Sequence, residues 1–345
     1  MRPHPMLFPF AAIYGLLVWM RNVFFDVGIL KTTDVGVPVI SIGNITAGGT
    51  GKTPIVIETA KVLLNAGKKV AVVSRGYGRK TTGTIVVSDG SRILADAESG
   101  GDEPMQIASH VKDAIVIADE NRVRGAKKAV NDFGAEVIVL DDGFQHRYIK
   151  RSKDIVLVNS RQLPSETMLI PAGYRREPLH SLKRANAVVV TKSVDKKGAE
   201  SILDVLRIDT QQSAFSCSYQ PAGMRHLFGG IAQSTEILKG HIAVAFSGIA
   251  APDAFRQSLE SCGVTIKQFF IFDDHHQYSK ADLDTIVLAF ERSKADFILT
   301  TEKDAVRLAR FKDTLQSLPV SALIMNVTMH QDEAWRTYLL KGLSV

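Results

Sequence analysis

The sequence predicts an α/β fold with two domains and a separate apolar segment at its N-terminus. Short, almost wholly apolar runs alternate with helical patterns from residue 31 to residue 212. A glycine-rich loop at 44–51 stands between one such run and the helical pattern that follows it. The alternation stops after residue 212 and resumes near residue 233. Strands that are apolar throughout are typical of a parallel sheet that helices cover on both faces.

We therefore expect a first domain at 31–212 and a smaller second α/β domain at 233–345, whose last helix could pack back on the first domain. Between them, residues 213–232 are expected to form a two-stranded linker, with two short strands on either side of Pro221. The length of 345 residues is sufficient for two domains.

The central motif is the loop after the apolar run at 39–42. Glycines allow backbone N–H groups to turn inward around phosphate oxygens, and the start of the following helix adds partial positive charge. Lys52 would reach the terminal phosphates and the Thr53 hydroxyl would bind Mg²⁺. The first domain is thus predicted to be P-loop NTPase-like, with nucleotide-binding residues Thr46, Ala47, Gly48, Gly49, Thr50, Gly51, Lys52 and Thr53.

One position departs from the general P-loop pattern, because Thr46 stands where a glycine is usual. The alternative interpretation is an ordinary glycine-rich turn followed by a helix-capping threonine.

A second motif, Val-Ile-Val-Leu-Asp-Asp at 137–142, has the form of a Walker B strand. An acidic residue at the end of such a strand can hold Mg²⁺ directly or through water, beside Thr53. Either Asp141 or Asp142 could make this contact. The alternative is a simple Asp-Asp-Gly turn.

Composition excludes little. Hydrophobic residues make up 45% of the chain, charged residues 23%, and the formal net charge is +6. Such a charge suits nucleic acid, an anionic membrane surface or a phosphorylated substrate, but the chain has no long basic tract, so nucleic acid is the weakest choice. Cys217 and Cys262 are isolated in the sequence and are expected to be free thiols in a reducing compartment.

The N-terminal residues 3–20 contain no Lys, Arg, Asp or Glu, and Arg2 and Arg21 flank them. No cleavage site of small residues follows, which argues against a signal peptide. Prolines and a glycine interrupt the run, which argues against a transmembrane helix. Tyr14 and Trp19 favour a helix lying at the membrane interface, and we predict this role for residues 1–30. A plain core-packing helix and a true span remain as alternatives.

Seven motifs occur in order: GNITAGGTGKTP, SRGYGR, GDEP, LDDGFQHR, PAGYRREP, DDHHQY and TTEKDAVR. Their order and spacing resemble the tetraacyldisaccharide 4'-kinase (lipid A 4'-kinase) family over roughly residues 10–310. Thr46 is ordinary for this family.

The resemblance implies ATP- and Mg²⁺-dependent phosphorylation of the 4'-hydroxyl of tetraacyldisaccharide 1-phosphate, in lipid A biosynthesis. It places the enzyme at the cytoplasmic face of the bacterial inner membrane, as a peripheral or monotopic protein. The lipid disaccharide and the membrane surface are the expected partners, with no nucleic acid and no obligate protein partner.

The resemblance also assigns roles to residues. Asp102 and His275 would be the acid–base pair, with His276 as the competing histidine, and Lys52 would act on the phosphates. Arg176 would bind the nucleotide and Glu177 would join the metal shell with Thr53, Asp141 and Asp142. The substrate site would be lined by Arg75, Tyr77, Gln145, His146 and Arg147. Without the family, Asp102 would be interpreted as a helix cap.

Two other functions fit parts of the sequence. A membrane-recruited regulatory ATPase would carry a lysine just before the paired glycines, where this chain has Ala47. A GTPase would carry Asn-Lys-x-Asp, which 191–195 resembles with one residue too many.

Overall fold

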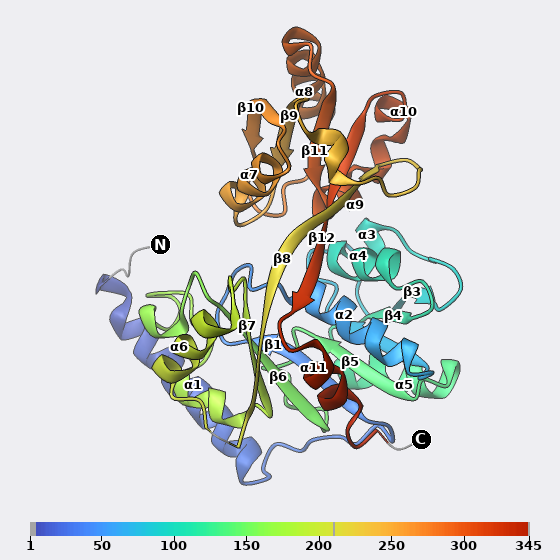
Figure 1. Cartoon of the computed structure of the whole chain (residues 1–345). Helices are drawn as coiled ribbons and strands as arrows, with labels where there is room; N and C mark the ends of the chain where they lie inside the picture. Colours follow the sequence, from blue (N-terminus) through green and yellow to red (C-terminus); the bar gives the residue numbers. More distant parts are fainter. Residues whose placement is uncertain (1–4, 210, 344–345) are drawn as a thin grey trace. The chain divides into compact units, whose positions relative to one another are not determined.

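The computed structural model describes residues 5–209 and 211–343. The chain forms two compact units (Figure 1). Unit 1 consists of Met1–Ser218 and Val327–Val345, and unit 2 of Tyr219–Asn326. Arg2 and Pro3, where the predicted apolar segment begins, lie outside the described residues.

Unit 1 contains a sheet with the strand order β8-β7-β6-β1-β5-β2-β4-β3. Neighbouring strands are parallel, except that β3 is antiparallel to β4. The strands are β1 (Val39–Asn44), β2 (Val70–Ser74), β3 (Ile85–Asp89), β4 (Ile115–Ala118), β5 (Val137–Asp141), β6 (Lys153–Asn159), β7 (Ala187–Thr191) and β8 (Ser213–His226). Because the strands are parallel, loops that follow β1, β2, β4 and β5 leave the same edge of the sheet.

Helix α5 (Arg122–Phe133) of unit 1 begins and ends at residues suited to those positions. Asn121 caps α5 by accepting a hydrogen bond from the Arg124 amide, and Gly134 ends it with a φ of 65°. The α-helices are α1 (Phe8–Asp26), α2 (Lys52–Asn65), α3 (Ala97–Gly100), α4 (Asp102–His110), α5 (Arg122–Phe133), α6 (Lys196–Leu206) and α11 (Asp332–Leu340). Short 3₁₀ turns lie at Pro5–Leu7, Pro164–Glu166 and Leu179–Arg184.

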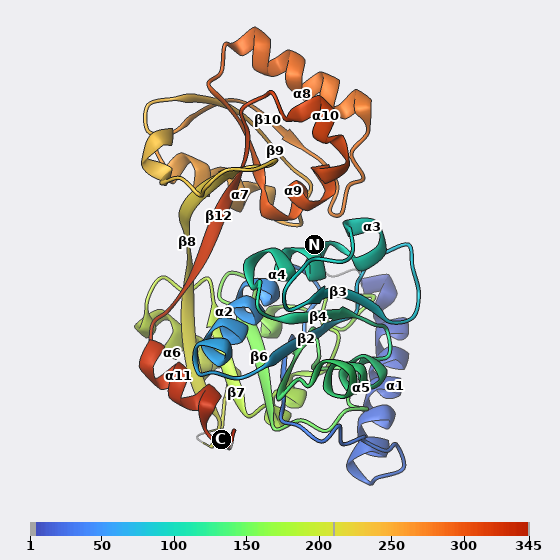
Figure 2. The ribbon, with the colours of Figure 1, turned by 90° about the vertical axis from the view of Figure 1, so that its right-hand side faces the viewer.

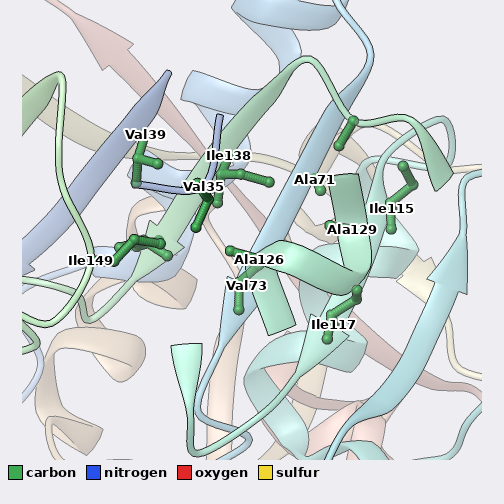
Figure 3. Close-up of a cluster of buried hydrophobic side chains, with 12 residues drawn as sticks. Val35, Val39, Ala71, Val73, Ile115, Ile117, Ala126, Ala129, Ile138 and Ile149 are labelled. Carbon is green, nitrogen blue, oxygen red and sulfur yellow. The ribbon is translucent and has the colours of Figure 1, made fainter. Parts of the chain in front are cut away.

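Helices cover both faces of the central strands. Alternate residues of β2 and β5 pack against Ala126 and Ala129 of α5, in the buried cluster that Figure 3 shows. The residues between them, such as Val72 and Val139, are equally buried. Figure 2 shows α2 and α5 on different sides of β2. The all-apolar strands are thus explained by burial on two faces.

Unit 2 contains the parallel strand order β10-β9-β11-β12. The strands are β9 (Ile242–Ser247), β10 (Thr265–Ile271), β11 (Phe297–Thr301) and β12 (Val320–Met329). The helices are α7 (Pro252–Ser261), α8 (Lys280–Ser293), α9 (Glu302–Leu308) and α10 (Lys312–Leu315), with 3₁₀ turns at Thr235–Leu238 and Ala309–Phe311. Phe246, Tyr278 and Leu283 are part of its buried core.

The connection between the units differs from the prediction. The expected pair of short strands within 213–232 is instead the single strand β8, which stays extended through Pro221 and Gly223. The second connecting strand is β12, which lies next to β8 in the strand order although it comes about a hundred residues later. Proline and glycine suggested a turn, but proline's fixed φ is equally compatible with an extended chain.

Candidate functional site

The glycine loop of unit 1 lies between β1 and α2, as a phosphate-binding loop requires. Gly48 and Gly51 have φ values of 109° and 80°, which side chains disfavour, and Gly51 is the N-cap of α2. Asn44 Nδ2 donates to Thr50 Oγ1 over 2.8 Å and braces the loop from inside. The amides at the start of α2 therefore point into a loop whose shape is fixed.

Two other segments hold this loop from outside. Thr46 forms an antiparallel bridge with Arg175, the Ala47 amide donates to the Tyr174 carbonyl, and the Arg176 amide donates to the Ile45 carbonyl. The extended backbone of this bridge requires no glycine, which accounts for the threonine at position 46.

From β7, Thr191 Oγ1 donates to the Thr50 carbonyl over 2.9 Å. Lys192 Nζ donates to the Gly49 carbonyl over 3.0 Å. The segment that faintly resembles a guanine-binding motif therefore braces the phosphate loop.

The two aspartates at the end of β5 have different surroundings. Asp142, with a left-handed φ of 50°, faces Arg176 at 2.8 Å and Lys52 Nζ at 3.6 Å. Burial alone would raise its pKa, but Lys52 and Arg176 hold the pKa below its usual value. This carboxylate therefore stays ionised between two cations.

Asp141 is buried, and one of its oxygens accepts from Ser74 Oγ over 2.9 Å. Its other oxygen, Oδ1, has no hydrogen-bond partner. Burial, Glu103 and Asp142 raise its pKa to about 7. A buried carboxylate with an unpartnered oxygen is expected to gain from a nearby cation.

Asp102 is the first residue of α4, and the N-cap position belongs to Gly101. Asp102 is therefore not the N-cap residue, contrary to the alternative interpretation. Its relative exposure is 9%.

The predicted substrate residues fall into two groups. Arg75 and Tyr77 lie exposed in the loop after β2, while Gln145 Nε2 donates to the Asn44 carbonyl. His146 is half-buried, and burial with Arg122 lowers its pKa to about 4, so its ring is neutral near pH 7. Arg147 instead contacts α1, donating to the Asn22 carbonyl and to Asp26.

Glu177 is fully buried between two arginines and an asparagine. Its oxygens accept hydrogen bonds from Arg21, Asn22 and Arg184. Burial alone would raise its pKa, but Arg184 and Arg21 keep the pKa below its usual value. Tyr14 Oη also donates to the Arg176 carbonyl over 2.8 Å. Helix α1 is thus tied to the segment that supplies Arg176.

The outer surface of α1 is apolar. Among the described residues, α1 is the one helix long and apolar enough to cross a membrane, judged by length and composition. Phe10, Ile13, Leu17 and Trp19 are each more than half exposed. Large exposed apolar side chains on one helix are typical of a membrane or partner surface.

His275 and His276 belong to unit 2. His275 has a left-handed φ of 63°, and its Nδ1 lies 3.3 Å from an Arg307 nitrogen. His276 stacks on Phe272 and its Nε2 bonds to Asp282 at 3.1 Å. The two neighbouring histidines therefore have different partners.

Sequence reasoning missed several residues that shape these regions: Tyr14, Ser74, Arg122 and Arg307. Ser74 and Arg122 contact Asp141, and each lies at the end of a strand or the start of a helix at the same sheet edge. That position was the available signal. The sequence predicts only a membrane contact for Tyr14, and Arg307 is the last residue of the TTEKDAVR motif.

Comparison with known proteins identifies the family. The family model described as tetraacyldisaccharide-1-P 4'-kinase matches residues 3–344. The chain belongs to the tetraacyldisaccharide-1-P 4'-kinase family. It is 40% identical to the tetraacyldisaccharide 4'-kinase of Chlorobaculum parvum, over 88% of this chain and 84% of that protein. The Chlorobium phaeovibrioides enzyme is 38% identical over 98% of this chain and 97% of its own.

A crystal structure of LpxK from Aquifex aeolicus in complex with ATP is also similar. It has a TM-score of 0.80 and 32% identity and covers 98% of both chains. The family and kinase predictions are confirmed, and so is the α/β fold with its P-loop-like sheet unit. The chain is an ATP-dependent kinase of lipid A biosynthesis, and the regulatory ATPase and GTPase alternatives fall with this assignment.

Proposed function

We propose that the chain transfers the γ-phosphoryl group of ATP in line to the 4'-hydroxyl of tetraacyldisaccharide 1-phosphate, using the glycine loop and the residues that face it. The observation that carries this proposal is the Lys52–Asp142–Arg176 contact beside the loop. Lys52 and the loop amides bind the phosphates, and Arg176 adds a second cation. Phosphoryl transfer needs mainly positioning and charge stabilisation, which such a set supplies.

A Mg²⁺ ion fits the residues present. The unpartnered Asp141 Oδ1 and the raised pKa of that buried carboxyl support a cation there. We propose that Thr53 and Asp141 hold the ion, with Asp142 beside it. When bound, Mg²⁺ would neutralise charge on the β- and γ-phosphate oxygens.

Among the described residues no group of three or more His, Cys, Asp or Glu side chains could hold a metal by themselves. That is expected of Mg²⁺, which keeps waters and phosphate oxygens as ligands. Glu177 is left out of this set because its oxygens already accept from Arg21, Asn22 and Arg184.

Asp102 is proposed to accept the hydroxyl proton, and His275 to assist it. Arg75, Tyr77, Gln145 and His146 are the proposed contacts of the disaccharide. Because the transition state of phosphoryl transfer is loose, the proton leaves late and a carboxylate is a sufficient base.

A labelled-ATP assay tests the main proposal. The full chain in detergent micelles, with lipid A disaccharide 1-phosphate and γ-labelled ATP, is expected to label the lipid. Unlabelled ATP should reduce labelling of the lipid far more than the same concentration of GTP. Hydrolysis of ATP with no labelled lipid would contradict the proposal.

The proton acceptor is tested by substitution. Asp102→Asn and His275→Gln should each lower kcat by roughly 10²–10⁴-fold. Together they should cost little more than the worse single change, because residues acting as a unit are non-additive. His276→Gln is the matched control. A near-normal kcat for Asp102→Asn would show that Asp102 is not the proton acceptor. A larger loss of kcat in His276→Gln than in His275→Gln would show that His276 is the assisting histidine.

The membrane role of α1, at the cytoplasmic face of the inner membrane, is also a proposal. Exposed Ile13 and Leu17 support it. Burying such a side chain is worth about 1.5–3 kcal/mol when complete. Ile13→Ser with Leu17→Ser should therefore weaken binding to anionic vesicles by about tenfold or more.

The matched control is Val194→Ser with Ile231→Ser, two exposed apolar residues elsewhere in the chain. Basal ATP hydrolysis should remain unchanged in both double variants. Equal vesicle binding of the two would show that α1 is not the membrane contact.

A further inference from the structure

A buried ion pair lies beside His275 in unit 2 and has no part in the mechanism above. Asp304 and Arg307 are both buried, and Asp304 Oδ1 lies 3.0 Å from Arg307 Nη1. They occupy α9, which follows β11 directly (Figure 1). A buried ion pair is seldom retained for stability alone, since apolar residues often do as well.

The pair is held rigidly. Thr301 Oγ1 donates to Asp304 Oδ2 over 2.6 Å, and the Gly248 amide donates to the same oxygen over 3.1 Å. Arg307 Nη1 also donates to the Gly248 carbonyl over 2.9 Å. The guanidinium is thus fixed by groups from the ends of β9 and β11.

The second arm of the guanidinium reaches His275. Arg307 Nη2 lies 3.3 Å from Nδ1 of the imidazole. A guanidinium has only donors, so Nδ1 must be the acceptor. In the neutral ring the proton then sits on Nε2.

The backbone of His275 is fixed at the same point. Its φ of 63° is left-handed, which is uncommon for a residue with a side chain. Its amide donates to the Gly248 carbonyl over 3.2 Å, the same oxygen that Arg307 contacts. The other ring nitrogen, Nε2, lies 3.9 Å from Asp274 Oδ1.

We propose that Arg307 is a positioning residue that holds His275 as the Nε2–H tautomer. His275 then enters the reaction as a hydrogen-bond donor through Nε2. The proton of the sugar hydroxyl must therefore go to a different group, which is Asp102 in the proposed function. This inference rests on the proposed role of His275 and adds the direction of its hydrogen bond.

Nitrogen NMR of the full chain tests the tautomer directly. The protein is labelled with ¹⁵N-histidine in detergent micelles, and His275→Gln assigns the signals. In a sample at about pH 8.5, His275 should show a protonated Nε2 and an acceptor Nδ1. A protonated Nδ1 would overturn the proposal without any further variant.

Two variants test whether Arg307 is the cause. Arg307→Lys keeps a cation for Asp304, but an ammonium lacks the fork that contacts Asp304 and His275 together. Arg307→Met combined with Asp304→Asn removes both charges, so neither is left buried alone. In either variant the Nδ1 signal should move and a mixture of tautomers should appear.

The control is Arg310→Lys. Arg310 lies in the 3₁₀ turn that follows α9, and its guanidinium donates to the Tyr278 carbonyl. This variant should leave the His275 signals unchanged. The His276 signals should stay unchanged in all of these variants. Unchanged His275 signals in a folded Arg307→Lys or double variant would overturn the assignment.

Kinetics separate this inference from the proposed function. Arg307→Lys should lower kcat by about 10- to 100-fold with little change in KM for ATP, as expected when a reacting group is misplaced. If His275→Gln retains wild-type kcat, the catalytic role of His275 fails, whatever the NMR result. If kcat falls in His275→Gln but Arg307→Lys leaves the tautomer and kcat unchanged, only the positioning role fails.

Discussion

The two units place polar groups at the carboxyl ends of parallel strands by different means. In unit 1 the loop between β1 and α2 presents backbone amides, and glycines at 48 and 51 give it its shape. In unit 2 the ends of β9 and β11 meet around side chains, with Asp304 and Arg307 at the centre. One arrangement depends on backbone conformation and the other on a buried ion pair.

This difference predicts different sensitivities. The conformation of a backbone loop tolerates most side-chain changes, although catalysis still requires the Lys52 charge, and it is intolerant of an added Cβ where chains approach closely. A buried ion pair has the opposite weakness, because removing one partner leaves the other charge unpaired in the interior.

Lys52→Ala should lower kcat for phosphoryl transfer by about 10³-fold or more, because it removes a cation that acts on the transferred phosphate. The melting temperature should stay near that of the wild type, since the loop amides keep their conformation. Lys127→Ala, on the exposed surface of α5, is the control. Activity within tenfold of the wild type would show that this loop does not act on the transferred phosphate.

Asp304→Ala should destabilise unit 2 by about 3–5 kcal/mol, since Arg307 would remain buried without its partner. Asp132→Ala, which breaks the exposed Lys128–Asp132 pair, should cost less than about 1 kcal/mol. Urea unfolding followed by a probe in each unit measures both. Equal losses would show that burial of the pair does not matter.

Gly43→Ala and Gly248→Ala compare the same added Cβ in the two units. At Gly43 the Cβ would lie 2.7 Å from the Phe144 backbone nitrogen, and at Gly248 its nearest neighbours are at 3.1 Å. Gly43→Ala should cost about 1–3 kcal/mol and weaken ATP binding. Gly248→Ala should cost less, and the reverse order in thermal melting would contradict the contrast.

The smallest effect is expected at Lys153, a buried cation of unit 1 whose ammonium group is hydrogen-bonded to backbone carbonyls. Its Nζ donates to the Leu339 and Lys341 carbonyls near the end of α11. Burial, with Lys341 nearby, lowers its pKa to about 8 from 10.5.

Between those two values the folded state binds fewer protons than the unfolded state, so this residue's contribution to stability rises with pH. The stability of the wild type relative to Lys153→Met should therefore increase from pH 7.5 to about 9.5. A difference that does not change with pH would mean that the lysine titrates normally.

The sequence predicted what short-range physics controls. Apolar runs gave the buried strands, and Gly-Gly-Thr-Gly-Lys-Thr gave the loop and the start of α2. These features depend on residues within one turn or one strand of each other. The same local reasoning failed at Pro221 and Gly223, where a residue pair that often forms a turn stays extended within β8.

What only the tertiary structure decided are contacts between segments far apart in the chain. Sequence alone assigned Tyr14 to a membrane helix, but its hydroxyl donates to the Arg176 carbonyl, 162 residues away. It noted the motif that contains Arg307, but not that this side chain reaches His275 Nδ1 across 32 residues. No local pattern encodes such pairs, because they form only when strand ends from separate segments are brought to one edge of a sheet and packing fixes their side chains.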